Sequence, residues 1–291
     1  LAGVTVLGLG LLAGAGGMVE PASAASAPVN VTTSDLAGNG TEYDPYIIRN
    51  VSELQAIEQD LDAYYELGND IDASGTSQWN NGAGFDPIGS YCGSFCSDTA
   101  FTGQFEGAGH TISGLYINRG QTEGVGLFGY SQGTISDVEL TGVYVNGSRN
   151  VGGLVGNSDG VIQYSSVSGT VEGESNVGVL AGRSGGTAWV KSSSGSGSVT
   201  GKYNVGGLVG HVGHIVRNSS ASSDVSVEPE GSKAGGLVGE HYGIIRRSYA
   251  TGSVGESGTE IDDIGGLVGK TQNNGDIWNS YGSGSVGGAF Y

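Results

Sequence analysis

AGGLVGEHYGIIRRSYATGSV, residues 234–254, is the clearest copy of a pattern that recurs along the second half of this chain. Its first part is a GGLVG-like segment preceded by an aliphatic residue, and six such segments are present. Their central leucines are 27, 26, 28, 29 and 30 residues apart: Leu127, Leu154, Leu180, Leu208, Leu237 and Leu267. A fixed motif that returns at this period indicates a repeat architecture.

A second module follows each of the last five segments, and its internal spacing does not vary. It starts with an aliphatic residue, has a serine three positions later and a valine nine positions later. The starting residues are Ile162, Val190, Val216, Ile245 and Ile277. All length variation therefore lies just after GGLVG or between the valine and the next GGLVG. Because stacked strands must keep register while corners can vary, this pattern predicts a solenoid.

The repeated segments are expected to be strands. VGGLVG is too short and too rich in glycine for an amphipathic helix, and no period of 3.6 runs through the repeats. The chain contains 58 glycines and only 5 prolines among 291 residues, which suits tight turns and thin strands. Parallel strands need long return connections, so the predicted fold is all-β, a parallel β-helix. The serines could form a hydroxyl ladder facing inward or outward, and the handedness stays open.

The region before the repeats has a different pattern. SELQAIEQDLDAYYEL, starting at Ser52, places Leu54, Ile57 and Leu61 on one helical face, and Ser52 and Gln55 fit a capping box. We therefore predict a short helix within an N-terminal cap, because a solenoid exposes an apolar end that has to be covered.

The two ends of the sequence suggest a piece of a longer exported precursor. LAGVTVLGLGLLAGAGGMV is apolar and precedes Ala22 and Ala24, which fit an A-x-A cleavage site. The expected organisation is a signal peptide truncated at its N-terminus (1–24), a linker and start of the cap (25–50), a capping region (51–124) and a repeat solenoid (125–291). We expect the solenoid to continue beyond Tyr291, since the next central leucine would fall at about position 293 to 297 by the repeat spacing.

The charge balance excludes some partners. The chain has 11 Lys and Arg against 29 Asp and Glu, a formal net charge of −18. No basic stripe is present to neutralise phosphates, so nucleic acid and anionic membranes are not expected partners. Contact with a membrane is expected only if the N-terminal apolar segment is retained. The acidity fits either a salt-rich habitat or an ordinary acidic secreted protein.

The repeats resemble a known family. The recurring (V/I/A)GGLVG…G-x-I-x-x-SYATGSV pattern is similar to the GLUG motif of bacterial and archaeal surface proteins. The segments GNGTEYDPYIIRNVSELQAI, YYELGNDIDASG, FDPIG and FTGQFEGAGHTISGLYINR resemble the leader that precedes such repeats, so the likeness covers roughly residues 38–291. It implies an adhesin-like or cell-envelope protein, and GLUG arrays also precede the metallopeptidase domain of IgA-protease-like proteins. The motif brings no catalytic residues, and the third copy, VGVLAG followed by Trp189, departs from it.

Two features fit an extracellular location. Cys92 and Cys96 could close a local disulfide, which an oxidising compartment permits, whereas two cysteines alone do not make a zinc site. Five N-x-S/T triplets are candidate glycosylation sites, although such triplets also arise by chance: Asn30, Asn39, Asn50, Asn146 and Asn218.

The histidines give weak candidates for a transition-metal site. His211 and His214 form an H-x-x-H pair, and His241 lies one repeat later, so stacked corners could bring the three together. Solvated corner histidines are the favoured interpretation. His110 is expected to have a structural role.

The carboxylates cluster near one predicted corner. Glu172 and Glu174 lie in one repeat, and later repeats contribute further acids that include the weak calcium candidates Glu228, Glu230, Asp262 and Asp263, together with Glu256 and Glu260. Oxygen ligands of this kind suit Ca²⁺, but a solvated acidic surface is favoured and no cofactor is expected. Paired carboxylates could also cleave polysaccharides, but the sequence selects no pair.

We therefore expect a secreted or cell-surface scaffold that is not an enzyme. Its variable acidic corners would contact cell-surface or extracellular proteins or glycans, and the apolar ends of the solenoid could allow end-to-end self-association. The alternatives are a carbohydrate-active β-helix enzyme, which would need clustered carboxylates with shifted pKa values, or the stalk of a larger surface protein with a peptidase-like domain downstream.

Overall fold

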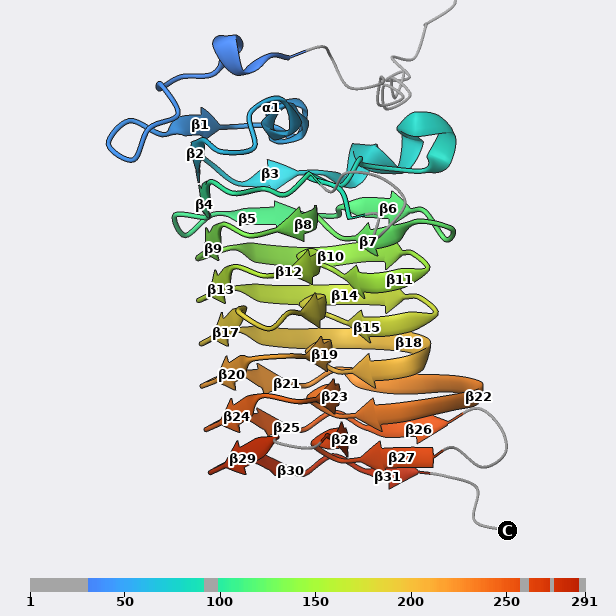
Figure 1. The fold of residues 1–291 in the computed structure, drawn as a ribbon. Helices are drawn as coiled ribbons and strands as arrows, with labels where there is room; N and C mark the ends of the chain where they lie inside the picture. The colour runs from blue at the N-terminus through green and yellow to red at the C-terminus, as the bar shows by residue number, and fades with distance from the viewer. Residues whose placement is uncertain (1–30, 92–98, 257–261, 273–274, 288–291) are drawn as a thin grey trace, which may run out of the picture.

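The computed structural model describes residues 31–91, 99–256, 262–272 and 275–287. In this part of the chain, strands stack as successive coils of a parallel β-solenoid, as Figure 1 shows from blue to red along the axis. The predicted fold class is confirmed. Every pairing between the named strands is parallel, and each strand lies beside its counterpart in the next coil.

Three sheets run along the axis of the stack. The first has nine strands: β1 (Tyr46–Ile48), β2 (Tyr64–Leu67), β4 (Gln104–Glu106), β9 (Thr134–Ser136), β13 (Val161–Gln163), β17 (Trp189–Lys191), β20 (Ile215–Arg217), β24 (Ile244–Arg246) and β29 (Asp276–Trp278). The second has six: β8 (Phe128–Ser131), β12 (Val155–Ser158), β16 (Ala181–Ser184), β19 (Val209–Val212), β23 (Val238–His241) and β28 (Val268–Thr271).

The third sheet bends around the remaining side of the stack. Its strands are β3 (Ile71–Asp72), β5 (Thr111–Ser113), β6 (Tyr116–Asn118), β7 (Glu123–Val125), β10 (Glu139–Asn146), β11 (Arg149–Gly152), β14 (Ser166–Glu172), β15 (Ser175–Gly178), β18 (Ser194–Gly206), β21 (Ser220–Ala221), β22 (Asp224–Gly235), β25 (Tyr249–Ala250), β26 (Val254–Glu256), β27 (Asp262–Gly265), β30 (Tyr281–Gly282) and β31 (Val286–Gly287). A coil thus passes through the second sheet, then the first, and then twice through the third. In two coils the two passes through the third sheet form one continuous long strand, β18 in one coil and β22 in the next.

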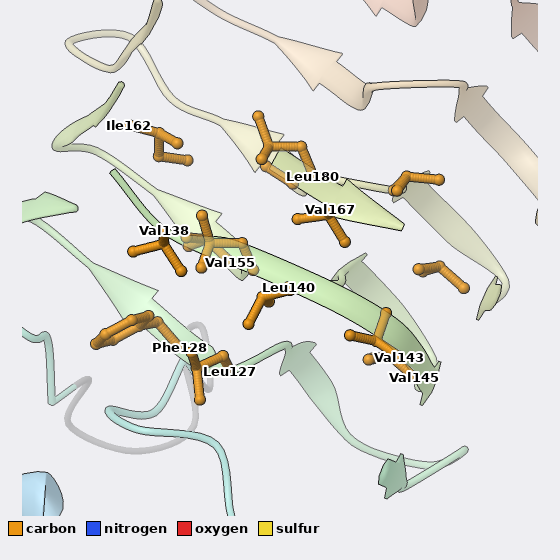
Figure 2. Close-up of a cluster of buried hydrophobic side chains, with 14 of the residues drawn as sticks. Leu127, Phe128, Val138, Leu140, Val143, Val145, Val155, Ile162, Val167 and Leu180 are labelled. Atoms are coloured by element: carbon orange, nitrogen blue, oxygen red, sulfur yellow. The ribbon is translucent and has the colours of Figure 1, made fainter. Parts of the chain in front are cut away.

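The register follows the spacing in the sequence. Each starting aliphatic residue pairs with the next in the adjacent coil, from Ile162 through Val190 to Val216, and the valines nine positions later pair in the same way. These side chains are buried up to Ile245 and Val254, whereas Ile277 and Val286 in the last described coil are exposed. Figure 2 shows side chains such as Leu140, Val155 and Ile162 in the hydrophobic interior. Regular stacking places each apolar side chain about 4.8 Å from its counterpart, which forms a continuous core.

The glycines of the VGGLVG segments are required by close backbone contact rather than by a left-handed conformation. A Cβ atom on Gly207 would overlap the carbonyl oxygen of Gly236 in the next coil, and one on Gly210 would overlap the backbone of Asn176 and Val177 in the preceding coil. The segment folds back sharply between the third and second sheets, so the backbones meet with no room for a side chain.

The departure in the third copy is compensated within its own coil. Val179 replaces the second glycine of the motif and is fully buried. The residue opposite it is Gly195, where the preceding coil has Val167 and the following coil has Ala221. In the preceding coil the glycine and the valine are exchanged, with Gly153 in the motif and Val167 opposite it. A Cβ on Gly153 would lie only 2.6 Å from Val167 Cγ1, so this coil has no room for a second large side chain. One large and one small residue therefore fill the same space, and this rung is uniform with the others.

The N-terminal helix is shorter than predicted, and its cap is different. Helix α1 spans Val51–Ala56 and continues as the 3-10 turn η2 (Ile57–Gln59), whereas the following tyrosines form strand β2. Ser52 and Gln55 do not form the capping box. Asn50 is the N-cap instead, because its side chain accepts hydrogen bonds from the backbone N–H groups of Ser52 and Glu53. The short 3-10 turns η1 (Thr33–Asp35), η3 (Ser74–Gln78) and η4 (Asn80–Gly82) complete the region.

The strands before the repeats continue the same sheets. Tyr65 of β2 pairs with Phe105 of β4, which pairs with Ile135 of β9 at the start of the repeat array. All three side chains are buried, as are Leu54 and Ile57 of the helical segment. The leader therefore begins the solenoid with larger aromatic side chains in the core. The proposed domain boundaries stay a prediction.

Candidate functional site

A column of buried serines joins the coils at one corner. The Oγ atom of each serine donates a hydrogen bond to the carbonyl two residues earlier in its own coil, at 2.9 Å for Ser193 and Ser219. The same Oγ accepts the backbone N–H of the serine one coil before, so Ser193 N donates to Ser219 Oγ over 3.2 Å. Ser165, Ser248 and Ser280 continue this ladder. The hydroxyls are committed to structure, which leaves no nucleophile in this column.

A second ladder consists of asparagine amides beside the hexapeptide. Asn176 Nδ2 donates to Asn150 Oδ1, and Asn204 Nδ2 donates to Asn176 Oδ1, both over 2.7 Å. All three have φ near +54°, a left-handed conformation that asparagine tolerates. The next coil has Lys233 at this position, and its Nζ donates to Glu240 Oε1 over 2.8 Å. The amide ladder therefore ends and an ion pair replaces it.

An open groove lies on the third sheet and runs across several coils. Its volume is about 530 Å³, and its lining combines several apolar residues with many serines and threonines. The lining residues are Glu139, Leu140, Thr141, Ser166, Val167, Ser168, Ser194, Gly195, Ser196, Ser220, Ala221, Ser222, Tyr249 and Thr251. Such a surface can donate and accept hydrogen bonds with a hydroxylated ligand. It offers one carboxylate, Glu139, whereas most glycoside hydrolases need two.

The three histidine candidates have separate environments. His211 Nδ1 lies 3.5 Å from Glu240 Oε2, and its ring packs 5.3 Å from that of Tyr242. His214 meets the Trp189 ring edge-on at 5.6 Å, and His241 is fully buried in the column that also contains Val212. Burial lowers the pKa of His211 and of His241, which favours their neutral forms. His110 pairs with Asp70, with 3.3 Å between Nδ1 and Oδ1.

Glu240 is the most buried carboxylate near these histidines. Burial opposes its ionisation, but hydrogen bonds from Lys233 and Gln272 outweigh that effect and hold its pKa below the ordinary value. Its partners are therefore a lysine, a glutamine and one histidine. In the described part of the chain, no three His, Cys, Asp or Glu side chains lie close enough together to hold a metal ion.

The acidic residues of the predicted corner are only partly brought together. Glu172, Glu174 and Glu228 line a shallow depression of about 370 Å³ with hydroxyl and amide groups. Tyr144 donates its hydroxyl to Glu172 over 2.9 Å, and burial together with this hydrogen bond raises the pKa of Tyr144 to about 12.

The four calcium candidates do not form a common set of ligands. Glu230 pairs with Lys202 at 3.6 Å, and Asp263 pairs with Lys270 at 2.7 Å. Asp262 is exposed, and Glu228 faces the depression described above. Two of the four carboxylates thus already have a cation as partner. Glu260 and the side chain of Glu256 lie outside the described residues.

Other predicted features can be placed in part. Cys92, Cys96, Asn30 and the signal segment lie outside the described residues. Asn50 uses its side chain as the helix cap, and Asn146 donates to Asn118 over 3.0 Å. Asn39 and Asn218 are exposed, and Asn218 lies at a coil corner. Disulfide formation and glycosylation stay predictions.

The sequence reasoning missed a face of cationic and aromatic side chains on the first sheet. Lys191, Arg217 and Arg246 are in register on consecutive strands, and Trp278 follows on β29. The signal was present, because each of these residues directly follows the aliphatic residue that starts the second module. Residues one position beyond a buried strand residue point to the opposite face of a sheet.

The family comparison agrees with this geometry. The family model described as the GLUG motif matches residues 147–172 and 201–226. The two matched repeats are GLUG motifs. Each matched segment begins three residues before an asparagine of the amide ladder, Asn150 or Asn204, and ends in the valine-containing strand, so one GLUG unit corresponds to about one coil of the stack.

Two relatives match part of this chain. Halomucin of Haloquadratum walsbyi is 43% identical over 216 residues, which is 72% of this chain and 2% of halomucin. A protein described as a Gly-rich membrane protein of Evansella cellulosilytica is 34% identical over 137 residues, 45% of this chain and 15% of that protein. The chain thus spans a small part of either relative. None of the described helices is long and apolar enough to cross a membrane.

Two solved structures share the fold. One is a crystal structure described as an immunoglobulin A1 protease from Bacteroides ovatus. Its TM-score is 0.54 at 20% sequence identity, and the match covers 86% of this chain and 69% of that chain. The other is an IgA1 protease with a TM-score of 0.59 and 21% identity, covering 82% of this chain and 19% of that chain. At this identity the likeness concerns the β-solenoid fold alone. The GLUG matches and the relatives support a repeat domain of a surface protein.

Proposed function

We propose that this chain is a non-enzymatic segment of an extracellular surface protein, a rigid stalk whose faces contact other cells, matrix or glycans. The observation that carries the proposal is the unbroken register of the coils, from β1 to β29 in the first sheet. The serine ladder adds hydrogen bonds along the same axis. A structure of this kind is stiff because each coil is held by its neighbours.

The side chains of the described residues support binding more than catalysis. The groove on the third sheet contains a single carboxylate, the hydroxyls of the buried serine column are used in the ladder, and the histidines contact different partners. A nucleophile beside an oriented base, or two carboxylates facing one cleft, would be required for the common hydrolytic mechanisms. The depression lined by Glu172, Glu174 and Glu228 and the groove on the third sheet are instead suited to contact with large ligands.

The proposal is tested in the cells that produce the protein. An epitope tag in an exposed corner should be labelled on intact cells by an antibody that does not enter them, and external protease should remove the label. Purified protein should release no reducing ends from a panel of polysaccharides and should bind at least one cell-surface or matrix fraction. A tag that remains inside the cells would refute the surface location. Measurable hydrolysis of a polysaccharide would refute the non-enzymatic function.

A second candidate is a stalk that positions a catalytic domain elsewhere in the same protein. The observation that favours it is the fold shared with two structures named as IgA1 proteases, of which one is covered over only 19% of its length. This candidate predicts a peptidase-like domain in the complete gene product. Sequencing the intact gene and assaying the full-length protein against immunoglobulin or casein would decide between the two arrangements.

A further inference from the structure

We propose that the cationic face of the first sheet binds a carboxylated polysaccharide. This face, called the arginine strip below, consists of Lys191, Arg217, Arg246 and Arg247 with the aromatic residues Tyr164, Trp189 and Trp278. The inference rests on the proposed extracellular function and names the class of partner. Three observations carry it: the distribution of unpaired cations, the aromatic rings between them, and the hollow that they line.

The unpaired cations of this acidic chain are concentrated in the strip. Five of the 11 Lys and Arg form ion pairs with acids: Arg119, Arg183, Lys202, Lys233 and Lys270. Among described residues, the other six have no such pair, and four of those six lie in the strip. Arg217 Nε is in addition buried without a hydrogen-bond partner. Gathering like charges on one face is unfavourable unless an anion neutralises them.

The cations alternate with aromatic rings. Lys191 Nζ lies 4.8 Å from the Tyr164 ring centre, and the guanidinium carbon of Arg217 lies 5.1 Å from the Trp189 ring. Arg246 lies 5.7 Å from the Trp278 ring. Tyr164 and Trp278 are 53% and 54% exposed, so each keeps a free ring surface. A pyranose ring has an apolar C–H face that packs on such rings, while its carboxylate can meet the neighbouring cation.

The arginines also shape a hollow of about 160 Å³. It is lined by Arg217, Asn218, Arg246, Arg247, Trp278 and Asn279, and thus by guanidinium and carboxamide groups without a carboxylate. A guanidinium presents two parallel N–H donors that match the two oxygens of a carboxylate. Successive coils are about 4.8 Å apart, close to the length of one sugar residue in an extended chain. The strip therefore offers one cation per sugar along the stack.

A carboxylated sugar fits this face better than a polyphosphate. Nucleic-acid binding draws its affinity from neutralising many phosphates, but the strip has four cations on a protein of net charge −18. Uronic acids carry at most one charge for each sugar and present the apolar ring face that the exposed tyrosine and tryptophan require. Charge complementarity is thus local to the strip, and the aromatic contacts supply the remaining affinity.

The test uses the full chain and polygalacturonate in isothermal titration at 0.15 M NaCl. We expect saturable binding by the wild type and at least a tenfold loss in the double variant Arg246→Gln/Arg247→Gln, whose side chains are exposed. The matched control is Arg49→Gln/Arg149→Gln, which removes two other unpaired cations and should change affinity less than twofold. Trp278→Ala should weaken binding about fivefold, and Trp278→Phe should retain most of it.

Three results would overturn the inference. They are an equal loss in both double variants, unchanged binding of fully methyl-esterified polygalacturonate, or tighter binding of polyuridylate than of polygalacturonate. The first would indicate a non-specific charge effect, the second a ligand chosen without its carboxylates, and the third a nucleic acid. Release of reducing ends during the titration would instead refute the non-enzymatic function and leave the binding inference intact. If the tagged protein is found on the cell surface but the purified chain does not bind polygalacturonate, the arginine-strip inference is refuted and the proposed surface function is not.

Discussion

Exchanging Val179 and Gly195 should preserve the third GLUG coil, although each single change should damage it. Val179 is fully buried, and the nearest atoms to a Cβ on Gly195 would be Gly207 O at 3.1 Å, Leu208 Cδ1 at 3.2 Å and Val179 Cβ at 3.3 Å. The exchanged coil would have glycine and valine in the same order as Gly153 and Val167 in the preceding coil.

The magnitudes follow from the packing. Val179→Gly removes three buried carbons, about 2.4 kcal/mol at ~0.8 kcal/mol each, and the greater backbone freedom of glycine in the unfolded chain costs ~0.4–1 kcal/mol more. Gly195→Val overfills the same space, which typically costs ~1–3 kcal/mol. Independent effects would sum to about 5 kcal/mol, whereas the exchange should lose only ~1–2 kcal/mol, a coupling of about 3 kcal/mol.

The assay is urea unfolding followed by circular dichroism for the wild type, both single variants and the double variant. The free energy of unfolding is obtained from the midpoint and slope of each transition. Additivity of the two single changes to within about 0.5 kcal/mol would refute the idea that the two positions share one space. A double variant less stable than either single variant would have the same meaning.

Three further predictions concern the ladder, pH and salt. Ser219→Ala should lower the free energy of unfolding by about 1–3 kcal/mol, because it leaves the buried N–H of Ser193 without an acceptor, whereas Ser222→Ala on the exposed groove should have little effect in the same urea assay. Burial lowers the pKa of His241 in the folded protein. The unfolded chain therefore binds more protons once the pH falls below the ordinary histidine pKa of 6.5, and the free energy of unfolding should decrease as pH drops from 7 to 5. His241→Val, which introduces the residue type of Val212 in the preceding coil, should reduce this pH dependence, and an unchanged pH profile in the variant would contradict the prediction. The melting temperature should rise between low and molar NaCl as repulsion within a chain of net charge −18 is screened over about 3 Å, and stabilisation by micromolar Ca²⁺ without a salt effect would favour a calcium site instead.

The sequence predicted the repeated part of the fold because register is encoded there by fixed spacing. Ile162 and its counterparts fell into one column as expected. The error lay at residues 52–67, where Leu54 and Ile57 fit a helical period but Tyr64–Leu67 alternates between half-buried and buried positions. A short helix followed directly by a strand contains both patterns, and pairing of Tyr65 with Phe105 decides between them.

The proposed binding faces were harder to predict than the core. Inward positions repeat because each must fit its neighbours, whereas outward positions such as Lys191, Arg217 and Arg246 differ in residue type and show no motif. Aligning the residues that directly follow Val190, Val216 and Ile245 would have revealed the column of cationic side chains. The hydroxyl groove depends on how the third sheet bends, and spacing in the sequence carries no information about that curvature.

The confinement of length variation to the corners has a genetic consequence. When two coding copies of the hexapeptide mispair and recombine, the product gains or loses whole coils, and every ten-residue stretch with its serine and valine is kept intact. Each product can continue the stack, because the ten-residue stretches pair in the same parallel register from coil to coil. A single-residue insertion inside a ten-residue stretch cannot be accommodated at a corner and breaks the strand register. Selection can thus adjust the reach of a protein of this kind in steps of one coil, through unequal crossing-over, without passing through an unfolded intermediate.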